Sequence, residues 1–591
     1  MPRLSAGSWR RGVAVLIVVG CAVAFTLRLV DIQIVSAAGL SADAAGKRAV
    51  PVTIPSLRGD IVDRDGEVFA TTDERYDVQF SPKNTRLNEG KFPRYSEAEG
   101  KWTEVTAAQA FEEIAEITGT SAKKLQQTVD ADPKSDFAYV KRSVDLTTLN
   151  RLKALNIPWM TFESNHARSY PNGAVGGNVV GFSGTDGPLA GVELSQNDCL
   201  VGTDGEESYE RGADGVALPG SMVVTQRAID GGTVQLTISR DLQYEAQQII
   251  NGQVDATRAE YGLLTILDAK TGELLAVAED GSVDPGDVDA SDAGKREARS
   301  FTSPYEPGST FKALTAAAHI NEGKATPLSV NPTPDHWQPE ANVRFQDWFG
   351  HGITDWTLTG VLVYSSNVGI SMFGSQLSPE KRYDYLRRFG IGESTQAGLP
   401  AEDSGMLYPV DEWDRQTSYT TMFGQGLSST IVQTASAYQA IANDGVRIPP
   451  SLVKSCTSAD GEVVEPDHGA PVEVVSKRTA EQVRDMLEVI GKDGLVSQYV
   501  KIPGYRVGGK TGTAQQSNGR GGYRPDFVYS FAGMFPMDDP QYVIVSTVAF
   551  PKKGDGTVAA TTAFHDAAEA TIRTFHLPPS SGKYEKLPIE K

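Results

Sequence analysis

The chain has few cysteines and few histidines. Cys21, Cys199 and Cys456 are the three cysteines among 591 residues, and they are too few and too scattered for a disulfide framework or a thiolate metal site. We therefore expect unpaired thiols. A Cys199–Cys456 bridge stays open as the less favoured alternative, because sequence alone gives no geometry to test it. The seven histidines show no HExxH or comparable spacing, so we expect no catalytic metal and no bound cofactor.

The chain also has fewer basic residues than acidic ones. The formal net charge is −20, whereas a protein that binds duplex nucleic acid needs a basic surface to release counterions from phosphates. We therefore expect no nucleic-acid partner.

Apolar residues at 40% and charged residues at 22% are typical of a globular protein. The length of 591 residues exceeds what one core normally serves, which predicts two or three units outside the membrane.

One long apolar run lies near the N-terminus. Gly12–Leu27 is uncharged, and at about 1.5 Å per residue it falls slightly short of a hydrocarbon core of roughly 30 Å. An extension through Val30, with Arg28 reaching outward, makes a workable span. Three arginines (Arg3, Arg10 and Arg11) precede the run without any acidic residue. By the positive-inside rule we expect residues 1–11 in the cytoplasm, a single-pass anchor over 12–33 and the rest of the chain outside.

Two cleavage signals are alternatives to a retained anchor. Val18–Cys21 resembles a lipoprotein cleavage box, and Ala22–Ala24 resembles a signal-peptidase site. The apolar run continues past both of them, so the retained anchor is the favoured interpretation.

The remaining chain shows two different patterns. Residues 34–232 alternate short apolar stretches with Gly, Pro and Asp turns, which predicts an irregular α+β domain with helices at Ala107–Ile117 and Lys123–Val129. From Thr233 onward, clear strand and helix patterns appear. We expect strands at 235–238, 263–267, 274–277, 507–514, 528–535 and 542–550, and helices at 242–251 and 563–575.

The order of these elements predicts the fold class. Strands from both ends of the segment 233–577, with a helical pattern in its middle, indicate an α+β domain in which one antiparallel sheet is sandwiched by helices. Residues 578–591 are rich in Pro, Ser and Lys, and we expect a disordered tail there.

Ser309 and Lys312 form the first candidate for chemistry. A serine hydroxyl is a poor nucleophile at neutral pH unless a nearby amine acts as a base, and residues three apart on a helix share a face. The chain contains five Ser-x-x-Lys matches, so the spacing alone decides nothing. Pro307 and Gly308 precede Ser309 and an apolar run follows it, which places this serine at a helix start, where free N–H groups favour negative charge. We interpret the other four matches as chance: they begin at Ser121, Ser378, Ser451 and Ser580.

Two later segments complete an ordered set. Ser365-Ser366-Asn367 precedes an apolar helical run, whereas a rival at 195–197 lies in the irregular upstream domain. Lys510-Thr511-Gly512-Thr513 follows two glycines within an apolar strand pattern, where a substrate backbone can pair with the strand edge. A second Lys-Thr-Gly, at 270–272, sits in a hairpin turn that needs glycine for positive φ. Only one choice gives the order Ser-x-x-Lys, Ser-x-Asn, Lys-Thr-Gly within one domain.

This ordered triplet resembles the signature of the penicillin-recognising serine enzymes, which include penicillin-binding proteins and serine β-lactamases. Further segments narrow the resemblance to class B penicillin-binding proteins, and the organisation is similar to their septal, FtsI-type members. In that family the upstream segments shape the junction between a non-catalytic pedestal of dimerisation type, here 34–232, and the catalytic domain. The similarity runs from about residue 28 to 577. The segments that carry it are Arg28–Gln33, Arg58–Gly66, Arg168–Gly173, Gly181–Phe182, Gly191–Glu193, Tyr305–Lys312 and Phe423–Gly426.

The resemblance implies a peptidoglycan D,D-transpeptidase. Ser309 would attack the penultimate carbonyl of a stem peptide that ends in D-Ala-D-Ala, with Lys312 as the base, and β-lactams would acylate the same serine. An amine from a neighbouring stem would then release the acyl-enzyme as a crosslink. The resemblance implies proton relay by Ser365, amide binding by Asn367 and binding of the terminal carboxylate by Lys510, Thr511 and Thr513, with Gly512 as a further substrate-binding residue. It also implies an oxyanion hole from the backbone N–H groups of Ser309 and Thr513. A nearby Lys510 would lower the pKa of Lys312, because like charge and burial both disfavour the charged amine.

Other classes fit the sequence less well. A β-lactamase needs a Glu-x-x-Leu-Asn type segment for deacylation, and none occurs between Val368 and Gly509. A D,D-carboxypeptidase shares all three motifs, but the anchor and the large N-terminal domain disfavour it. A β-lactam sensor would carry several membrane spans and a zinc protease motif, and an idle scaffold would have lost a motif.

Partners follow from the resemblance alone. It implies a glycosyltransferase of the shape, elongation, division and sporulation (SEDS) family and other divisome proteins. The sequence leaves open whether the enzyme serves the septum or the side wall, and which amine is the acceptor.

Overall fold

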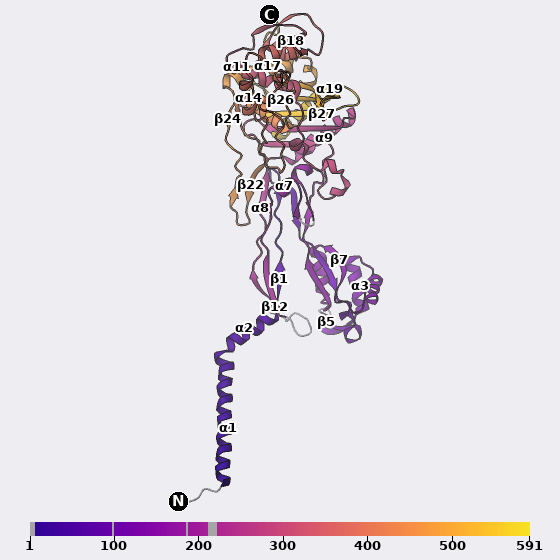
Figure 1. Ribbon diagram of the computed structural model, residues 1–591. Coiled ribbons are helices and arrows are strands. Elements are labelled where there is room, and N and C mark those ends of the chain that lie inside the picture. The colour runs from indigo at the N-terminus through magenta and orange to yellow at the C-terminus, as the bar shows by residue number, and fades with distance from the viewer. Residues whose placement is uncertain (1–5, 97–99, 185–186, 211–220) are drawn as a thin grey trace. The chain divides into compact units, whose positions relative to one another are not determined.

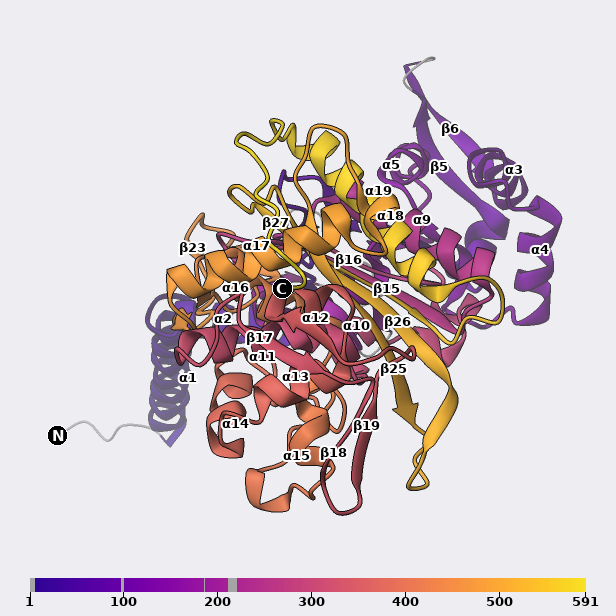
Figure 2. The ribbon, with the colours of Figure 1, turned by 90° about the horizontal axis from the view of Figure 1, so that it is seen from above.

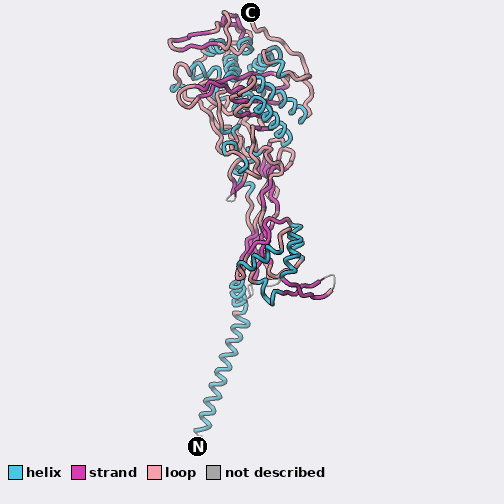
Figure 3. Tube along the Cα trace, turned by 90° about the vertical axis from the view of Figure 1, so that its right-hand side faces the viewer, coloured by secondary structure: helices cyan, strands magenta, loops and turns pink. Residues whose placement is uncertain are grey.

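The N-terminal apolar run folds into a single long helix. In the computed structural model, which describes residues 6–96, 100–184, 187–210 and 221–591, α1 spans Ala6–Val30 and a π-helical turn, Asp31–Val35, continues it (Figure 3). The stretch Trp9–Val35 is apolar and long enough to cross a membrane, and its side chains are not buried by the rest of the protein. The helix agrees with the anchor expected over 12–33.

This apolar helix belongs to the first of two units that the contacts define, residues 1–57 with 202–230. Helix α2 (Ala37–Arg48) follows α1 and leads into β1 (Ala49–Ile54). Strand β1 pairs antiparallel with β12 (Gly205–Glu210), which pairs in turn with β13 (Val223–Gln226). Residues distant in sequence therefore form one small sheet.

The second unit, residues 58–201 with 231–591, contains a subdomain with its own core at 76–164. Its three-stranded sheet has the order β7-β4-β8, beside the hairpin β5-β6. The two expected helices are present as α3 and α4. The bounds are β4 Tyr76–Phe80, β5 Lys91–Ser96, β6 Lys101–Thr106, α3 Ala107–Thr118, α4 Ala122–Ala131, β7 Ala138–Val144, α5 Leu146–Ala154 and β8 Met160–Ser164.

A six-stranded sheet joins segments from both sides of the expected boundary at residue 232. Strand β14 (Thr233–Leu236) pairs in parallel with β2 (Ile61–Val62) and antiparallel with β22 (Val453–Thr457). The sheet order is β23-β22-β14-β2-β3-β9, and the outer strands are β23 (Val463–Val464), β3 (Val68–Asp73) and β9 (Ala167–Ser169). The chain enters the second unit at Gly231, next to the expected boundary, yet the upstream segments of that unit share this sheet and one hydrophobic core with the segments after residue 232.

The catalytic domain is built on a five-stranded antiparallel sheet with the order β16-β15-β27-β26-β25. The strand edge that carries Lys510–Thr513 is the free edge of the sheet, on β25. In Figure 2, α9 and α19 lie on one side of this sheet and α16 on the other. The bounds are α9 Arg240–Thr257, β15 Tyr261–Asp268, β16 Leu274–Glu279, α16 Ile431–Ala442, β25 Gly508–Ser517, β26 Tyr523–Phe535, β27 Tyr542–Ala549 and α19 Gly556–Phe575.

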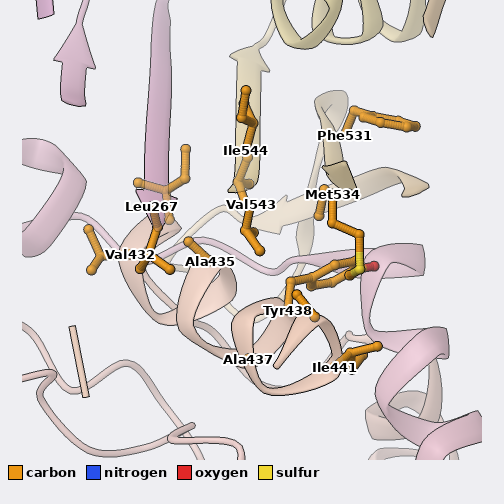
Figure 4. Close-up of a cluster of buried hydrophobic side chains, with 14 of the residues drawn as sticks. Leu267, Val432, Ala435, Ala437, Tyr438, Ile441, Phe531, Met534, Val543 and Ile544 are labelled. Carbon is orange, nitrogen blue, oxygen red and sulfur yellow. The ribbon is translucent and has the colours of Figure 1, made fainter. Parts of the chain in front are cut away.

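Burial on both faces explains the strand composition. All eight residues of β27 are buried, as expected for a strand that helices cover on both sides. Leu267 and Val543 pack toward Val432, Ala435 and Tyr438 of α16 (Figure 4). The expected architecture, an antiparallel sheet sandwiched by helices, is confirmed.

Shorter elements surround the sheet (Figure 1). Upstream are α6 Gly177–Val180, β10 Ser183–Gly184, β11 Gly187–Pro188, α7 Gly191–Ser195 and α8 Asn197–Leu200. The helical side of the catalytic domain holds α10 Arg299–Thr302, the 3-10 turn η5 Gly308–Phe311, α11 Lys312–Asn321, α12 Leu358–Val363, α13 Asn367–Gly374, α14 Pro379–Arg388, α15 Thr417–Thr420, the 3-10 turn η7 Thr421–Phe423, α17 Lys477–Asp493 and α18 Ser497–Val500. Two-stranded antiparallel sheets are β17 Val330–Thr333 with β20 Thr354–Thr357, the hairpin β18 His336–Glu340 with β19 Val343–Gln346, and β21 Val446–Arg447 with β24 Val472–Glu473.

The upstream motifs converge on one buried carboxylate. The Glu193 side chain is fully buried and pairs with Arg58 through Oε2 and with Arg168 through Oε1, both at 2.7 Å. Tyr170 donates to the same Oε1 at 3.2 Å. A buried carboxylate is stable only when it is paired in this way, so these motifs have a structural reason to occur together.

Two expectations are wrong. Cys199 and Cys456 form a disulfide, with Cα atoms 6.1 Å apart across 257 residues of sequence, because α8 and β22 both lie beside β14. The C-terminal segment 578–591 is not a free tail. The Ile589 carbonyl accepts a hydrogen bond from the Thr357 N–H at 3.0 Å, and the Tyr584 hydroxyl donates to Asp493 at 2.7 Å.

Candidate active site

The turn that carries Ser309 is held from several sides. Gly308 has a φ of 59°, and its N–H donates to the Gly424 carbonyl at 2.9 Å. The buried hydroxyl of Tyr438 donates to the Thr310 carbonyl at 2.7 Å. Ser309 itself is partly exposed in the 3-10 turn that leads into α11. The expected helix start is present, and fixed contacts to η7 and α16 set its orientation.

Ser365 connects the two lysines that the sequence singled out. The Ser365 hydroxyl accepts from Lys510 Nζ at 3.0 Å and from Lys312 Nζ at 3.3 Å. Lys312 Nζ also donates to the Ser365 carbonyl, and Lys510 Nζ donates to Thr511 Oγ1 at 3.2 Å. The three motifs, each far from the others in sequence, therefore meet at one serine hydroxyl.

Burial changes the protonation of both lysines. Burial, followed by the charge of Lys510, lowers the pKa of Lys312 well below its usual value, and the carboxylate of Asp347 acts in the opposite direction. Burial lowers the pKa of Lys510 to about 7. A neutral amine can accept a proton, so the site holds candidate bases that work near neutral pH.

Strand β25 packs directly against the turn of Ser309. A Cβ added at Gly512 would lie 2.3 Å from Ser530 Oγ and 2.7 Å from the Pro307 carbonyl oxygen. A Cβ added at Gly308 would lie 3.1 Å from the Thr513 carbonyl oxygen. Only glycines allow this approach, which brings the backbones of Ser309 and Thr513 together, as an oxyanion hole requires.

A cleft of about 880 Å³ opens beside these residues. Its wall contains the predicted residues Ser309, Ser365, Asn367, Thr511 and Thr513, while Lys312 and Lys510 are buried below it. Sequence reasoning missed the aromatic side chains of the wall, because nothing in the local pattern distinguishes them from core residues. They are Trp348, Tyr364, Phe423, Tyr499, Phe527 and Tyr529.

The rival motifs have other partners. The Ser378 hydroxyl caps α14, which starts at Pro379. Asn197 accepts from Arg58 at 2.8 Å. Lys270 pairs with Asp539 at 2.7 Å in the turn of a hairpin, where Gly272 has a φ of 77°. These contacts give these three rivals a structural role. Within the described ranges, no group of three or more His, Cys, Asp or Glu side chains could hold a metal ion.

Taken together, the sheet with a glycine-bordered free edge, the serine at a helix start and the two buried lysines joined through a second serine define a serine acyl-transferring enzyme of the penicillin-recognising class. Residues 262–569 match the penicillin binding protein transpeptidase domain, and residues 53–186 match the penicillin-binding protein dimerisation domain. The chain therefore belongs to the class B penicillin-binding proteins.

Individual relatives agree with this membership. The chain is 38% identical to penicillin-binding protein PbpB of Mycolicibacterium smegmatis, over 94% of this chain and 88% of that protein. It is 27% identical to peptidoglycan D,D-transpeptidase FtsI of Escherichia coli, over 97% of this chain and 93% of that protein. A crystal structure of penicillin-binding protein 3 from Mycobacterium tuberculosis, complexed with aztreonam, matches with a TM-score of 0.68 at 30% identity, over 91% of this chain and 100% of that chain.

Proposed function

We propose that this chain is a peptidoglycan D,D-transpeptidase that crosslinks stem peptides through an acyl-enzyme on Ser309 and is acylated there by β-lactams. The observation that carries the proposal is the Ser365 hydroxyl, which lies between the amines of Lys312 and Lys510 at the base of the cleft. The family membership and the names of the relatives support the reaction, and the aztreonam complex of a relative supports β-lactam binding.

Acylation starts with loss of the Ser309 proton. Neutral Lys312 takes this proton while the Ser309 oxygen attacks the carbonyl carbon of the penultimate D-Ala. The carbonyl oxygen becomes an oxyanion, which the backbone N–H groups of Ser309 and Thr513 stabilise. Such donors are typically worth about 3 kcal/mol of the barrier.

Departure of the terminal D-Ala needs a proton on its nitrogen. The proton passes from Lys312 through the Ser365 hydroxyl to the leaving amine as the C–N bond breaks, which leaves the acyl group on Ser309. Thr511, Thr513 and Lys510 hold the terminal carboxylate, and Asn367 binds a backbone amide of the donor. Gly512 allows the donor to lie along the β25 edge as an added strand.

An amine from a second stem peptide completes the reaction. It attacks the acyl carbon and gives up a proton to Lys312, which returns this proton to the Ser309 oxygen as the ester C–O bond breaks and the new amide forms. Attack by water instead would make the enzyme a D,D-carboxypeptidase, so the nature of the acceptor separates these two activities.

We place the catalytic domain outside the cytoplasmic membrane. The apolar helix Trp9–Val35 supports a single-pass anchor, and Arg3, Arg10 and Arg11 before it support a cytoplasmic N-terminus. The names PbpB and FtsI of the relatives support a role in division at the septum. A SEDS-family glycosyltransferase and divisome proteins are the partners that this role requires.

Labelling by a fluorescent penicillin tests the nucleophile. The full chain in detergent should take up one label, and mass spectrometry should find it on the peptide that contains Ser309. Ser309→Ala should abolish the labelling. Ser121→Ala removes the serine of another Ser-x-x-Lys segment and should label like the wild type. Labelling of the Ser309→Ala variant at a different serine would contradict the assignment.

A second measurement tests the acceptor. With a D-Ala-D-Ala stem peptide and an added amine, a transpeptidase forms the amide product, and a carboxypeptidase forms only the shortened acid. Exclusive hydrolysis at high amine concentration would favour the carboxypeptidase.

A further inference from the structure

A buried carboxylate lies directly behind the Ser365–Asn367 segment. The side chain of Asp347, in the loop after β19, has no exposed surface. Its Oδ2 accepts from the Ser366 hydroxyl at 2.6 Å, and its Oδ1 accepts from the Val368 N–H at 3.0 Å. The carboxylate therefore holds the residues on both sides of Asn367.

The segment needs such support because its backbone is strained. Ser365 has a φ of 57°, and the left-handed region costs a residue other than glycine roughly 1–2 kcal/mol. The hydroxyl of Ser366 donates to Asp347 and also accepts from the Gly369 N–H at 2.7 Å, which caps α13. The same hydroxyl thus ties the residue that follows the strained Ser365 both to the helix start and to the carboxylate.

His351 holds the other side of the carboxylate. Its Nε2 lies 3.1 Å from Asp347 Oδ2, and its Nδ1 lies 2.7 Å from the Gly352 carbonyl oxygen. The ring packs on Trp356, with centroids 4.5 Å apart. Asp347 therefore cannot turn away from Ser366 without losing contacts in two other directions.

We propose that Asp347 is a positioning residue that holds the Ser365–Asn367 segment in the conformation in which the Ser365 hydroxyl bridges Lys312 and Lys510. The inference rests on the proposed transpeptidase function and adds a group that none of the three motifs contains. Asp347 acts through Ser366 and Val368, and by its charge on Lys312, without touching the substrate.

The charge of Asp347 provides a readout that a purely structural role would not affect. The groups that act on the protonation of Lys312 are the Lys510 amine of β25, which lowers the pKa of Lys312, and Asp347, which raises it. Asp347 itself faces His351. Loss of the negative charge should lower the pKa of Lys312 further, so the neutral base persists to lower pH.

The experiment compares acylation rates of the full chain in detergent with a fluorescent penicillin between pH 5 and pH 9. Asp347→Asn should slow acylation at pH 8 by about 10- to 100-fold, since small displacements of catalytic groups cost up to about 100-fold, and should move the acid limb of the rate profile to lower pH. Asp280→Asn is the matched control. Asp280 is a buried carboxylate that pairs with Arg299 at 2.9 Å, and it does not line the cleft. Its variant should keep the wild-type rate and acid limb.

A second pair of variants decides the case if Asp347→Asn does not fold, as judged by its thermal unfolding midpoint. Ser366→Ala removes a helix cap together with the contact to Asp347, and Ser378→Ala removes a helix cap alone. Slower acylation in Ser366→Ala, but not in Ser378→Ala, supports the inference, and the acid limb should stay in place because the charge remains.

Two results would overturn it: a folded Asp347→Asn variant with the wild-type rate and acid limb, or equal rates in the two cap variants. A wild-type chain that no penicillin acylates would instead refute the proposed function itself.

Discussion

Two buried lysines that share one serine hydroxyl are the central feature at the residue scale. Two ammonium groups cannot both stay charged in such a place at little cost, because burial and like charge each favour the neutral amine. Burial lowers the pKa of both lysines. Lys312 begins the helix that follows Ser309, whereas Lys510 lies beside Thr511 on the β25 edge, so we propose Lys312 as the base and Lys510 as the partner for a substrate carboxylate.

This division of roles predicts the effect of Lys510→Met. The variant should acylate about 100- to 1,000-fold more slowly, the range typical for the loss of one charge-stabilising donor. Its acid limb should move to higher pH, because the neighbouring charge that lowers the pKa of Lys312 is gone. Rate profiles with a fluorescent penicillin measure both effects. Lys454→Met, an exposed lysine of β22, should behave like the wild type, and an acid limb that moves to lower pH would contradict the assignment.

Glu306, just before the nucleophile turn, titrates near neutral pH. Burial raises the pKa of its carboxyl to about 7, and its backbone N–H donates to the Gln516 side chain at 2.7 Å. A raised pKa means that the folded state favours the protonated acid. That stability is full below the unfolded value of about 4.5 and is lost as the pH rises through about 7.

Glu306→Gln should therefore gain stability relative to the wild type as the pH rises. The difference in thermal unfolding midpoint, variant minus wild type, should increase between pH 5 and pH 8 by an amount on the order of a few °C. Glu322→Gln is the control. The pKa of Glu322 is lowered, chiefly by a hydrogen bond from Tyr385, so its carboxylate is ionised throughout this range. A constant difference for Glu306→Gln would show that the carboxyl is not kept protonated.

At the scale of elements, the close packing of η5 on β25 decides whether the cleft can work. The two elements approach at Gly308 and Gly512, where a side chain would collide with backbone atoms. The disulfide joins a different pair of elements, helix α8 and strand β22 of the six-stranded sheet. Packing thus holds η5 against β25, whereas a covalent bond ties the upstream helix α8 to strand β22 of the downstream segment.

Gly512→Ala tests the packing of η5 on β25. The added methyl group would lie 2.3 Å from Ser530 Oγ and 2.7 Å from the Pro307 carbonyl oxygen, so the turn and the strand must separate. We expect acylation to fall at least about 100-fold, the cost of a displacement near 1 Å, in a protein that still folds. Gly252→Ala, in α9 with no atom within 4 Å of the new Cβ, should acylate normally. Comparison of labelling rates and unfolding midpoints checks both variants, and a normal rate for Gly512→Ala would refute the close approach.

At the scale of the whole molecule, the apolar helix and the candidate active site belong to different units of the chain. The first unit contains the apolar helix and the β1-β12-β13 sheet, and the second contains every residue assigned to the reaction. Each unit brings together segments that are far apart in sequence. The apolar helix can therefore be removed without removing any residue of the candidate active site.

Removal of residues 1–33 should accordingly release a soluble protein that still reacts with penicillin. We expect its acylation rate to stay within about twofold of that of the full chain in detergent, because no contact of the site involves residues 6–33, the part of the deleted segment that the structure describes. Labelling after fractionation into soluble and membrane material measures both properties. Loss of labelling in a folded, soluble protein would show that the anchor is needed for the site itself.

Much of this fold and of the candidate site is readable from sequence. The β15–β16 hairpin, the last three strands and helices α3 and α4 were expected where they occur, because each has a strong period and clear turn residues. Helix α19 begins at Gly556, seven residues before the expected start, since Asp555 caps its first turn through the N–H groups of Thr557 and Val558. A cap of this kind outweighs the weak helix propensity of the residues that follow.

By itself, the sequence determined which segments form helices or strands, where the long apolar run lies and which motifs accompany Ser309. Each of these depends on residue types within a few positions of one another. Only the tertiary structure decided that Cys199 meets Cys456, that Ile589 pairs with Thr357, that Ser365 bridges two lysines and that Asp347 stands behind it. The physical reason is the same in each case. A local pattern reports which face of an element is apolar, whereas a contact across the fold depends on which faces meet when the whole core is packed.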